Sequence, residues 1–271
     1  MKNRKVKKMK CGIVQGCSSL ELWENVNALK RYVEESKEQG CSVLCLPEAF
    51  LTGYAPKAVS NLAISKQSEA LQYVAGMAKE YQMDLLVGFM EQSEVGYHLT
   101  HGIFCGDGTR EFYRKTHLGQ REQEVFKAGD KLPVFTLSCG LKIGIQMCVE
   151  THFPEITQTL SLRGAEVVFA PHAVPRVAGS RKVIWSKIIP ARSYDNRVYL
   201  ACCNLWDEEK FGGGCLVTDP NGDVAAEYYE EKEALICFDV ELEKVRCYHE
   251  DSVSMKKRYY PGLRKAELYA E

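Results

Sequence analysis

Three polar side chains with reactive chemistry come at the ends of strand-like segments in this 271-residue sequence. Glu48 ends the apolar run CSVLCLPE, Lys115 follows the aromatic-rich EFYR, and Cys148 ends the alternating segment LKIGIQMC. A carboxylate can act as a general base, an ammonium group can stabilise an oxyanion, and a thiol can act as a nucleophile. If the fold gathers these three ends, the sequence predicts covalent catalysis by Cys148.

The acid and the lysine each have a plain structural interpretation as well. A carboxylate that ends a buried strand is partly desolvated, which raises its pKa towards the range of a general base. An acid such as Glu48 can equally cap a helix or lie in a surface turn, and Lys115 alone could be a solvated charge. The acids in REQEVFKAGD (residues 121–130) favour a functional lysine, because an ammonium group held by carboxylates is a fixed positive charge.

Cys148 differs from most of the 12 cysteines, which lie inside apolar runs where free cysteine behaves as a small buried hydrophobe. No CxxC pair occurs, and the histidines do not fall at metal-ligand spacing. Cys148 lies at the junction of a predicted strand and a predicted helix. There the helix N-terminus would favour the thiolate, and the Val149 amide could point at a substrate oxygen. A strand-to-helix turn that carries the nucleophile recurs in hydrolases.

Strands and helices that alternate along the whole chain must position these residues. The predicted strands cover residues 9–17, 41–48, 83–91, 97–105, 141–148, 165–173 and 198–204. The predicted helices cover residues 20–40, 60–82, 154–163, 180–195 and 242–250. The segment CLVTDPNGDVAAEYY suggests a late hairpin with its turn at DPNG. This pattern predicts one α/β domain built on two sheets.

Composition and charge narrow the class of protein. The chain is 45% hydrophobic and 26% charged, and its 35 basic and 36 acidic residues give a net charge of −1. These values are typical of a folded protein without bulk attraction to nucleic acid or an anionic membrane. No secretory signal or membrane span is recognisable, so we expect a soluble, cytoplasmic protein. The basic residues 1–8 are interpreted as a solvated leader, and the tail from about residue 250 to 271 is too polar for a core strand.

The ordered motifs resemble the nitrilase superfamily of carbon–nitrogen hydrolases over nearly the whole chain. The main matches are LPEAF with the downstream Gly53-Tyr54, YRKTHL at residues 113–118 and CVETHFPE at residues 148–155. Supporting matches are ARSYDN (191–196), FGGGC (211–215) and DPNG (219–222). The resemblance implies a four-layer αββα sandwich in a single domain of residues 1–271, and a Glu-Lys-Cys triad formed by Glu48, Lys115 and Cys148. This chemistry needs no metal or organic cofactor.

The resemblance also implies a second glutamate that orients the lysine and the substrate. Its usual place is seven residues before the glycine that closes the next turn, Gly129, which selects Glu122, with Glu124 as the alternative. Val149 departs from the aromatic residue that many relatives have after the nucleophile, and from the tryptophan of nitrile-specific branches. Its backbone amide can still bind the oxyanion. His172 ends the strand after the nucleophile helix, where it could contact substrate or serve only the structure.

The motifs and the resemblance together predict a hydrolase that cleaves the C–N bond of a small linear amide through a thioester at Cys148. Alternatives with the same triad are an N-carbamoyl amine or amino acid amidohydrolase and a nitrilase. A non-catalytic assembly module is a remote alternative, because all four candidate residues are kept. The resemblance implies a homodimer or a larger homo-oligomer, in which Tyr259, Tyr260 and Tyr269 could form a contact.

Overall fold

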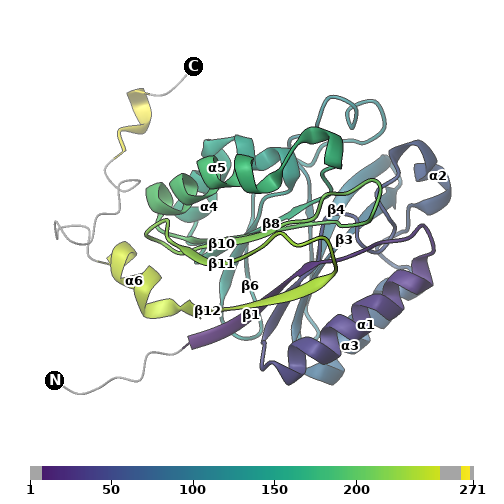
Figure 1. The fold of residues 1–271 in the computed structure, drawn as a ribbon, viewed down its shortest axis with the longest axis horizontal. Coiled ribbons are helices and arrows are strands. Elements are labelled where there is room, and N and C mark those ends of the chain that lie inside the picture. Colours follow the sequence, from purple (N-terminus) through teal and green to yellow (C-terminus); the bar gives the residue numbers. More distant parts are fainter. Residues whose placement is uncertain (1–7, 251–263, 269–271) are drawn as a thin grey trace.

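Two six-stranded mixed sheets lie face to face at the centre of the computed structural model, which describes residues 8–250 and 264–268 (Figure 1). The first sheet has the order β12 (Ala234–Glu241), β1 (Lys8–Gln15), β2 (Val43–Cys45), β3 (Asp84–Ser93), β4 (Gly96–Phe104), β5 (Arg110–Arg114). The second has the order β11 (Val224–Tyr228), β10 (Cys215–Thr218), β9 (Tyr199–Asn204), β8 (Val167–His172), β7 (Lys142–Ile145), β6 (Val134–Thr136).

Each sheet has three parallel strands at its centre and antiparallel strands outside them. The parallel strands are β1, β2 and β3 in the first sheet and β7, β8 and β9 in the second. The chain reaches Glu48 just after β2 and Cys148 just after β7, and His172 is the last residue of β8. Ligands of open α/β sheets bind outside the carboxyl ends of parallel strands, so this arrangement collects the candidate residues at one edge.

Helices cover the outer face of each sheet, and this confirms the predicted αββα sandwich. The helices α1 (Leu22–Glu38) and α3 (Glu69–Tyr81) lie on the first sheet, and α4 (Pro154–Leu162) and α5 (Arg181–Asn196) lie on the second (Figure 1). The largest apolar cluster draws its residues from both sheets and fills the space between them. In β7 and the segment after it, Ile143, Ile145 and Met147 face this core as the alternation predicted.

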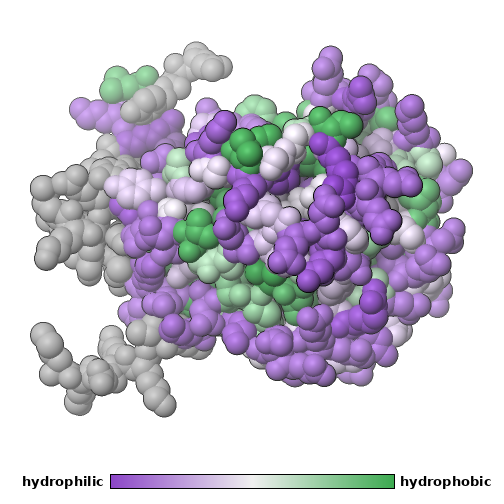
Figure 2. Space-filling view, in the orientation of Figure 1, coloured by the Kyte–Doolittle hydropathy of each residue, from purple (hydrophilic) through white to green (hydrophobic). Residues whose placement is uncertain are grey.

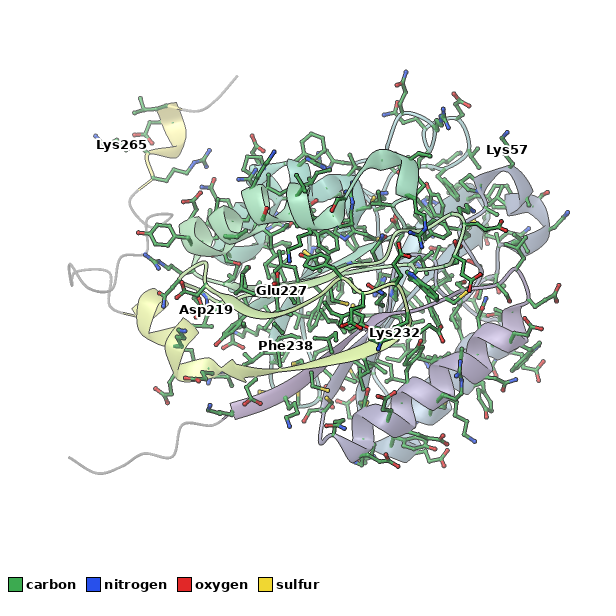
Figure 3. All side chains as sticks on the ribbon, viewed as in Figure 1. Lys57, Asp219, Glu227, Lys232, Phe238 and Lys265 are labelled. Atoms are coloured by element: carbon green, nitrogen blue, oxygen red, sulfur yellow. The ribbon has the colours of Figure 1, made fainter. Side chains whose placement is uncertain are left out.

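The remaining helices are short or lie at the ends of the chain. They are α2 (Val59–Leu62), α6 (Leu242–Glu250) and the 3₁₀ helices Pro56–Ala58, Cys148–His152, Arg176–Ala178 and Ala266–Leu268. The predicted hairpin at DPNG is confirmed by the antiparallel pairing of β10 with β11. Asp219 of this turn faces α6, where it pairs with Lys244 (Figure 3). The strand β12 then leaves the second sheet and pairs with β1 of the first.

Two sequence predictions were wrong in detail. The predicted helix over residues 60–82 is broken into α2 and α3, because Ile64 between them pairs with the end of β3. The Ile64 amide donates to Met90 O at 3.0 Å, and the Gln92 amide donates to Ile64 O at 2.9 Å. The predicted leader extends one residue too far, because Lys8 already belongs to β1, where it is paired with Glu241.

The surface seen in Figure 2 is mainly hydrophilic, with small hydrophobic areas between the charged residues. Within residues 8–250 and 264–268, no helix has the length and apolar character required to cross a membrane. The tyrosines that were predicted to form a subunit contact, Tyr259, Tyr260 and Tyr269, lie outside the described residues.

Candidate active site

Glu48 lies in a sharp bend directly after β2 and is completely buried. The next residue, Ala49, has a left-handed φ of 54°, which turns the chain across β3. The bend passes so close to Gly88 of β3 that a Cβ there would lie 2.5 Å from the Ala49 nitrogen and 2.8 Å from the Pro47 oxygen. Glycine at position 88 therefore makes room for the backbone that presents Glu48.

Lys115 follows β5 and is buried between two carboxylates. Its backbone amide donates to Leu99 O at 2.9 Å, and its own oxygen accepts from the Gly129 amide at 2.8 Å. Its ammonium group lies 2.9 Å from Glu48 Oε1 and 2.8 Å from each carboxylate oxygen of Glu122. Three buried charged groups of the predicted site thus form one network.

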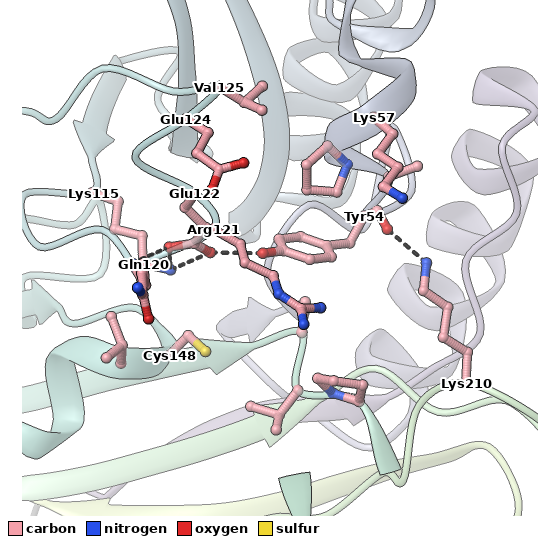
Figure 4. A pocket seen from close by; sticks show the side chains of 17 residues that line it. Tyr54, Lys57, Lys115, Gln120, Arg121, Glu122, Glu124, Val125, Cys148 and Lys210 are labelled. Carbon is pink, nitrogen blue, oxygen red and sulfur yellow. Dashed lines mark hydrogen bonds and ion pairs between the residues drawn. The ribbon is translucent and has the colours of Figure 1, made fainter. Parts of the chain in front are cut away.

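Glu122, rather than Glu124, is the glutamate that contacts Lys115. Tyr54 Oη donates to Glu122 Oε1 at 2.8 Å, and the Gly119 amide donates to Glu122 Oε2 at 2.7 Å (Figure 4). Glu124 is exposed and lines the outer part of the same pocket. Tyr54 belongs to the Gly53-Tyr54 pair noted in the sequence, but no sequence pattern predicts that its hydroxyl contacts Glu122.

Cys148 lies on a strained turn after β7. Its φ is 49°, in the left-handed region that a residue with a Cβ rarely adopts, and it begins a five-residue 3₁₀ helix. Strain of this kind persists where the surrounding structure holds the chain in place, and it recurs at nucleophile turns. The long helix α4 begins only at Pro154, so the prediction that a helix N-terminus directly favours the thiolate was wrong.

A buried carboxylate that was not identified from the sequence holds this turn. Glu150 Oε2 accepts from the Met147 amide at 2.6 Å, on the strand side of the nucleophile. Glu150 Oε1 accepts from Tyr113 Oη at 2.7 Å and from both the amide and the hydroxyl of Thr116, at 2.8 and 2.7 Å. Glu150 therefore ties the Cys148 turn to the residues on either side of Lys115.

Burial dominates the electrostatics of the site. It raises the pKa of Glu48 to about 7, against the opposing charge of Lys115. It also raises the pKa of Cys148 to about 12, with Glu48 acting in the same direction and Lys115 opposing. Burial disfavours the charge of Lys115, but Glu48 and the other nearby acidic groups raise its pKa above the ordinary value. The resting site therefore holds a neutral thiol, an ammonium ion and a carboxyl group that titrates near neutrality, in place of the expected resting thiolate.

Lys115, Glu122 and Cys148 line a pocket of about 1000 Å³. Tyr54 also lines it, beside Glu122 (Figure 4). Arg121 projects between Tyr54 and Cys148 (Figure 4). The outer lining also includes the cations Lys57 and Lys210, and Lys210 Nζ donates to Tyr54 O at 2.8 Å. The pocket is large enough to hold a small organic molecule against the thiol.

Comparison with known proteins places this geometry in a family. Residues 10–250 match the family described as carbon–nitrogen hydrolase. The chain belongs to this family. It is 28% identical to a probable nitrilase of Schizosaccharomyces pombe, over 90% of this chain and 91% of that protein. It is 29% identical to the omega-amidase NIT2 of Xenopus tropicalis, over 87% and 90% of the two chains.

Solved structures of the nitrilase superfamily share the fold. Saccharomyces cerevisiae Nit3, a member of branch 10 of the superfamily, superposes with a TM-score of 0.82 at 26% identity, covering 93% of this chain and 96% of Nit3. An amidase from Nesterenkonia sp. gives a TM-score of 0.82 at 24% identity over 96% and 95% of the chains, which bears on the fold alone. The prediction of a thiol-dependent enzyme of the carbon–nitrogen hydrolase class is confirmed; the substrate and the roles of single residues stay predictions.

The two tentative substrate contacts of this hydrolase both lie beside the nucleophile. Val149 lines the main pocket, and a second cavity next to Cys148 is lined by Val149 and His172. His172 is buried, its Nδ1 lies 2.7 Å from Ala170 O, and its ring packs against Trp185 at a centroid distance of 4.8 Å. The structure therefore brings all of the predicted site residues to one region.

The other cysteines fill structural positions. Besides Cys148, ten described cysteines are free thiols, and seven of them are buried, as expected for small hydrophobes: Cys11, Cys41, Cys45, Cys105, Cys202, Cys203 and Cys215. Cys41 and Cys237 approach each other, with their sulfur atoms 3.4 Å apart. Among the side chains that the structure describes, no group of three or more His, Cys, Asp or Glu could hold a metal ion.

Proposed function

We propose that this hydrolase cleaves the C–N bond of a small linear amide through a thioester on Cys148, with Glu48, Lys115 and Glu122 as the other reacting or orienting groups. The observation that carries the proposal is the buried ammonium group of Lys115, held by Glu48 and Glu122 in the pocket that Cys148 also lines. A cation fixed in this way is available to an oxyanion without reorganisation, which is a principal source of catalysis in acyl transfer.

Glu48 is suited to carry the proton of the thiol. Its Oε1 accepts from Lys115, while its Oε2 is buried and has no hydrogen-bond partner within the described chain. Since burial raises the pKa of Cys148 to about 12, the thiol keeps its proton until substrate binds. As the sulfur attacks the carbonyl carbon, the proton passes to Glu48. The Lys115 ammonium and the Val149 amide bind the oxyanion that forms, and loss of one such donor typically costs about 3 kcal/mol.

Collapse of the tetrahedral intermediate breaks the C–N bond. The protonated Glu48 gives its proton to the leaving nitrogen, so that ammonia or an amine departs and the acyl group stays on sulfur as a thioester. Glu48 then takes a proton from water, and the hydroxide adds to the thioester carbon. The C–S bond breaks, the carboxylic acid leaves, and Glu48 returns its proton to the sulfur, which regenerates the thiol. Glu122 keeps Lys115 in position through both half-reactions. The omega-amidase name of the relatives favours an amide over a nitrile as substrate.

A product assay tests the proposed function. We expect the purified protein to release ammonia and the carboxylic acid from at least one short linear amide in a panel that also contains carbamoyl amines and nitriles. Carbon dioxide in addition to the amine would identify a carbamoyl hydrolase. The Cys148→Ala variant should lose all turnover above the uncatalysed rate; full turnover by this variant would overturn the mechanism.

We also propose that the enzyme is a homo-oligomer, on the basis of the family resemblance. Sedimentation equilibrium of the full chain over a range of concentrations tests this proposal, and a monomer at all concentrations would contradict it. The cytoplasmic location stays a prediction.

A further inference from the structure

A second cavity, of about 240 Å³, opens beside Cys148 and has a lining unlike that of the main pocket. We call it the side pocket. Its polar lining consists of Cys148, His152, His172 and Arg181, and its apolar lining includes Val149 and Ile184. No acidic side chain of the described residues lines it. Pockets for whole small molecules usually span ~300–1000 Å³, so this volume suits one substituent of a molecule whose reacting bond lies at Cys148.

Arg181 is a buried cation without a counter-charge in the described part of the chain. Only 7% of its surface is exposed. Its Nη2 donates to the backbone oxygens of Ala178 and Gly179, at 2.8 and 3.2 Å. Its Nε is buried and has no hydrogen-bond partner, and no carboxylate pairs with it, among residues 8–250 and 264–268. Burial lowers the pKa of Arg181, as expected for a charge removed from water.

The position of Arg181 in its helix adds to this imbalance. It is the first residue of α5, and the N-terminus of a helix carries a partial positive charge that disfavours a cation. His152, in the same lining, is kept neutral: burial lowers its pKa, and the charges of Arg181 and Arg192 lower it further. A buried charge is strongly unfavourable unless it is paired. The side pocket is therefore a positive site that an anion would complete.

His172 supplies a hydrogen-bond acceptor in the same cavity. Its Nδ1 lies 2.7 Å from Ala170 O, and a carbonyl oxygen can only accept, so Nδ1 carries the hydrogen. Burial lowers the pKa of His172 to about 3, so the ring is neutral and Nε2 presents a lone pair. Nε2 is buried without a partner in the described structure. An N–H or O–H group of a ligand would satisfy it.

We propose that the side pocket binds a carboxylate of the substrate, with Arg181 as its counter-ion and His172 Nε2 as acceptor for a neighbouring N–H or O–H group. The inference rests on the proposed function, because the carboxylate is placed next to the sulfur that attacks the amide. The preferred substrates are therefore anionic amides. The carboxylate can be carried by the acyl portion or by the departing amine, and Arg181 is the specificity-determining residue in either case.

Two pairs of substrates distinguish a carboxylate on the acyl portion from a carboxylate on the departing amine. Succinamate and butyramide have the same length, and only succinamate has a carboxylate on the acyl portion. N-carbamoyl-β-alanine and propylurea also have the same length, and only the former has a carboxylate on the amine portion. We expect kcat/KM to be ~10–100-fold higher for the anion in one pair, the range of a charge-assisted hydrogen bond. In Arg181→Met the ratio within that pair should fall towards 1, and in Arg181→Lys it should fall only in part.

The exposed Arg121 of the main pocket provides a matched control. Arg121→Met removes the same charge from the main pocket and leaves the lining of the side pocket unchanged, so the anion preference should survive in it. Loss of the preference in Arg121→Met but not in Arg181→Met would overturn the proposal, as would equal kcat/KM values within both pairs for the unmodified enzyme. Because each ratio is taken within one variant, a general loss of active protein does not affect it.

A binding measurement keeps this test separate from the proposed function. Succinate should raise the Tm of Cys148→Ala by roughly 2 °C or more near saturation and leave that of the double variant Cys148→Ala/Arg181→Met unchanged. If no amide is hydrolysed but this shift appears, the proposed function fails and the side-pocket inference stands. If butyramide is hydrolysed but neither the preference nor the shift appears, the inference fails and the function stands.

Discussion

Two buried cations flank Cys148, and their surroundings are opposite. The Lys115 ammonium group is paired with the carboxylates of Glu48 and Glu122, at N–O distances of 2.9 and 2.8 Å, which balance its charge. Among residues 8–250 and 264–268, Arg181 contacts the backbone oxygens of Ala178 and Gly179 and no carboxylate. Burial disfavours the charge of both groups, but the neighbours raise the pKa of Lys115, whereas that of Arg181 is lowered. Lys115 is therefore a cation already paired within the protein, whereas the charge of Arg181 is available to the anion that we propose as its partner.

The largest effect is expected from removing the balanced cation. Lys115→Met should lower kcat/KM at least ~10³-fold, because the oxyanion loses its cation and the orientation of Glu48 is lost with it. It should also lower the free energy of unfolding by ~3–5 kcal/mol, since two buried carboxylates lose their partner. Arg181→Met should change stability little or raise it, because a desolvated charge is removed. Urea unfolding of both variants measures the contrast, and an equal loss in Arg181→Met would show that its charge is balanced by the protein.

The reaction side should also control the pH dependence. Glu48 must be ionised to accept the thiol proton, and burial raises its pKa to about 7. The value of kcat/KM for a neutral amide should therefore rise ~10-fold per pH unit below about 7 and level off above it. Because the folded-state pKa exceeds the ordinary value of 4.5, this carboxyl group favours folding at low pH, and its contribution is lost as pH rises through about 7. A plateau that extends down to pH 5 would contradict the assignment of Glu48.

A smaller loss is expected from moving the backbone that presents Glu48. In Gly88→Ala the new Cβ would meet the Ala49 nitrogen at 2.5 Å, so the bend must shift, and we expect kcat to fall ~10-fold or more. Gly76 of α3 is the matched control, because a Cβ there meets nothing within 4 Å. Gly76→Ala should keep kcat and stabilise the protein by ~1 kcal/mol. Steady-state kinetics and thermal unfolding compare the kcat and the stability of the two variants. Equal kcat values would show that the close approach at Gly88 does not control the position of Glu48.

The smallest of these effects is expected at Glu150, which ties the Cys148 turn to the Lys115 side. Glu150→Gln keeps the shape but places an amide N–H₂ against donors, which should cost ~1–3 kcal/mol of stability. We expect kcat to fall several-fold with little change in KM, because the residue positions the thiol and does not touch substrate. A variant of Thr116, Thr116→Val, removes one of the donors and should show a weaker form of the same change. A large rise in KM with normal kcat would assign Glu150 to substrate binding instead.

The sequence located the strand ends that bring Glu48, Lys115 and Cys148 together, but it did not indicate the surroundings of Arg181. Glu48, Lys115 and Cys148 each follow a strand, and periodicity together with ordered motifs locates strand ends. The choice between Glu122 and Glu124 depends on a turn geometry that short spacing does not determine. The importance of Glu150 and Gly88 comes from close approaches between distant segments, which no local pattern reveals. Arg181 belongs to no recognised motif, and its burial without a carboxylate partner among the described residues is a tertiary feature that no local pattern predicts.

In the fold as well, features that depend on local sequence patterns were predicted, and features that depend on tertiary contacts were missed. Local periodicity predicted one α/β domain on two sheets and the core face of β7, and turn chemistry predicted the hairpin at Asp219. The four-layer order came from the family resemblance. The break between α2 and α3 was missed, since it depends on a tertiary pairing of Ile64 with β3. Desolvation of Cys148 raises the pKa of its thiol more than Lys115 lowers it, which opposes the expected resting thiolate.

Thiol reactivity alone is a poor guide to the nucleophile of this enzyme. The pKa of Cys237 is lowered to about 7 by its hydrogen bond with Cys41, whereas that of Cys148 is raised by burial. A general alkylating agent is therefore expected to modify Cys237 readily in the absence of substrate. A decisive measurement must follow the acyl group of the substrate itself.

The acyl group can be followed by quenching the enzyme rapidly with acid during turnover of an accepted amide. Mass spectrometry of the resulting peptides then shows which residue carries the acyl group. We expect the mass of the acyl group to appear on the peptide containing Cys148 within the first turnover, to disappear as substrate is exhausted, and to be absent from Cys148→Ala. Turnover without any acylated peptide, or an acyl group on another residue such as Cys237, would rule out the proposed thioester at Cys148.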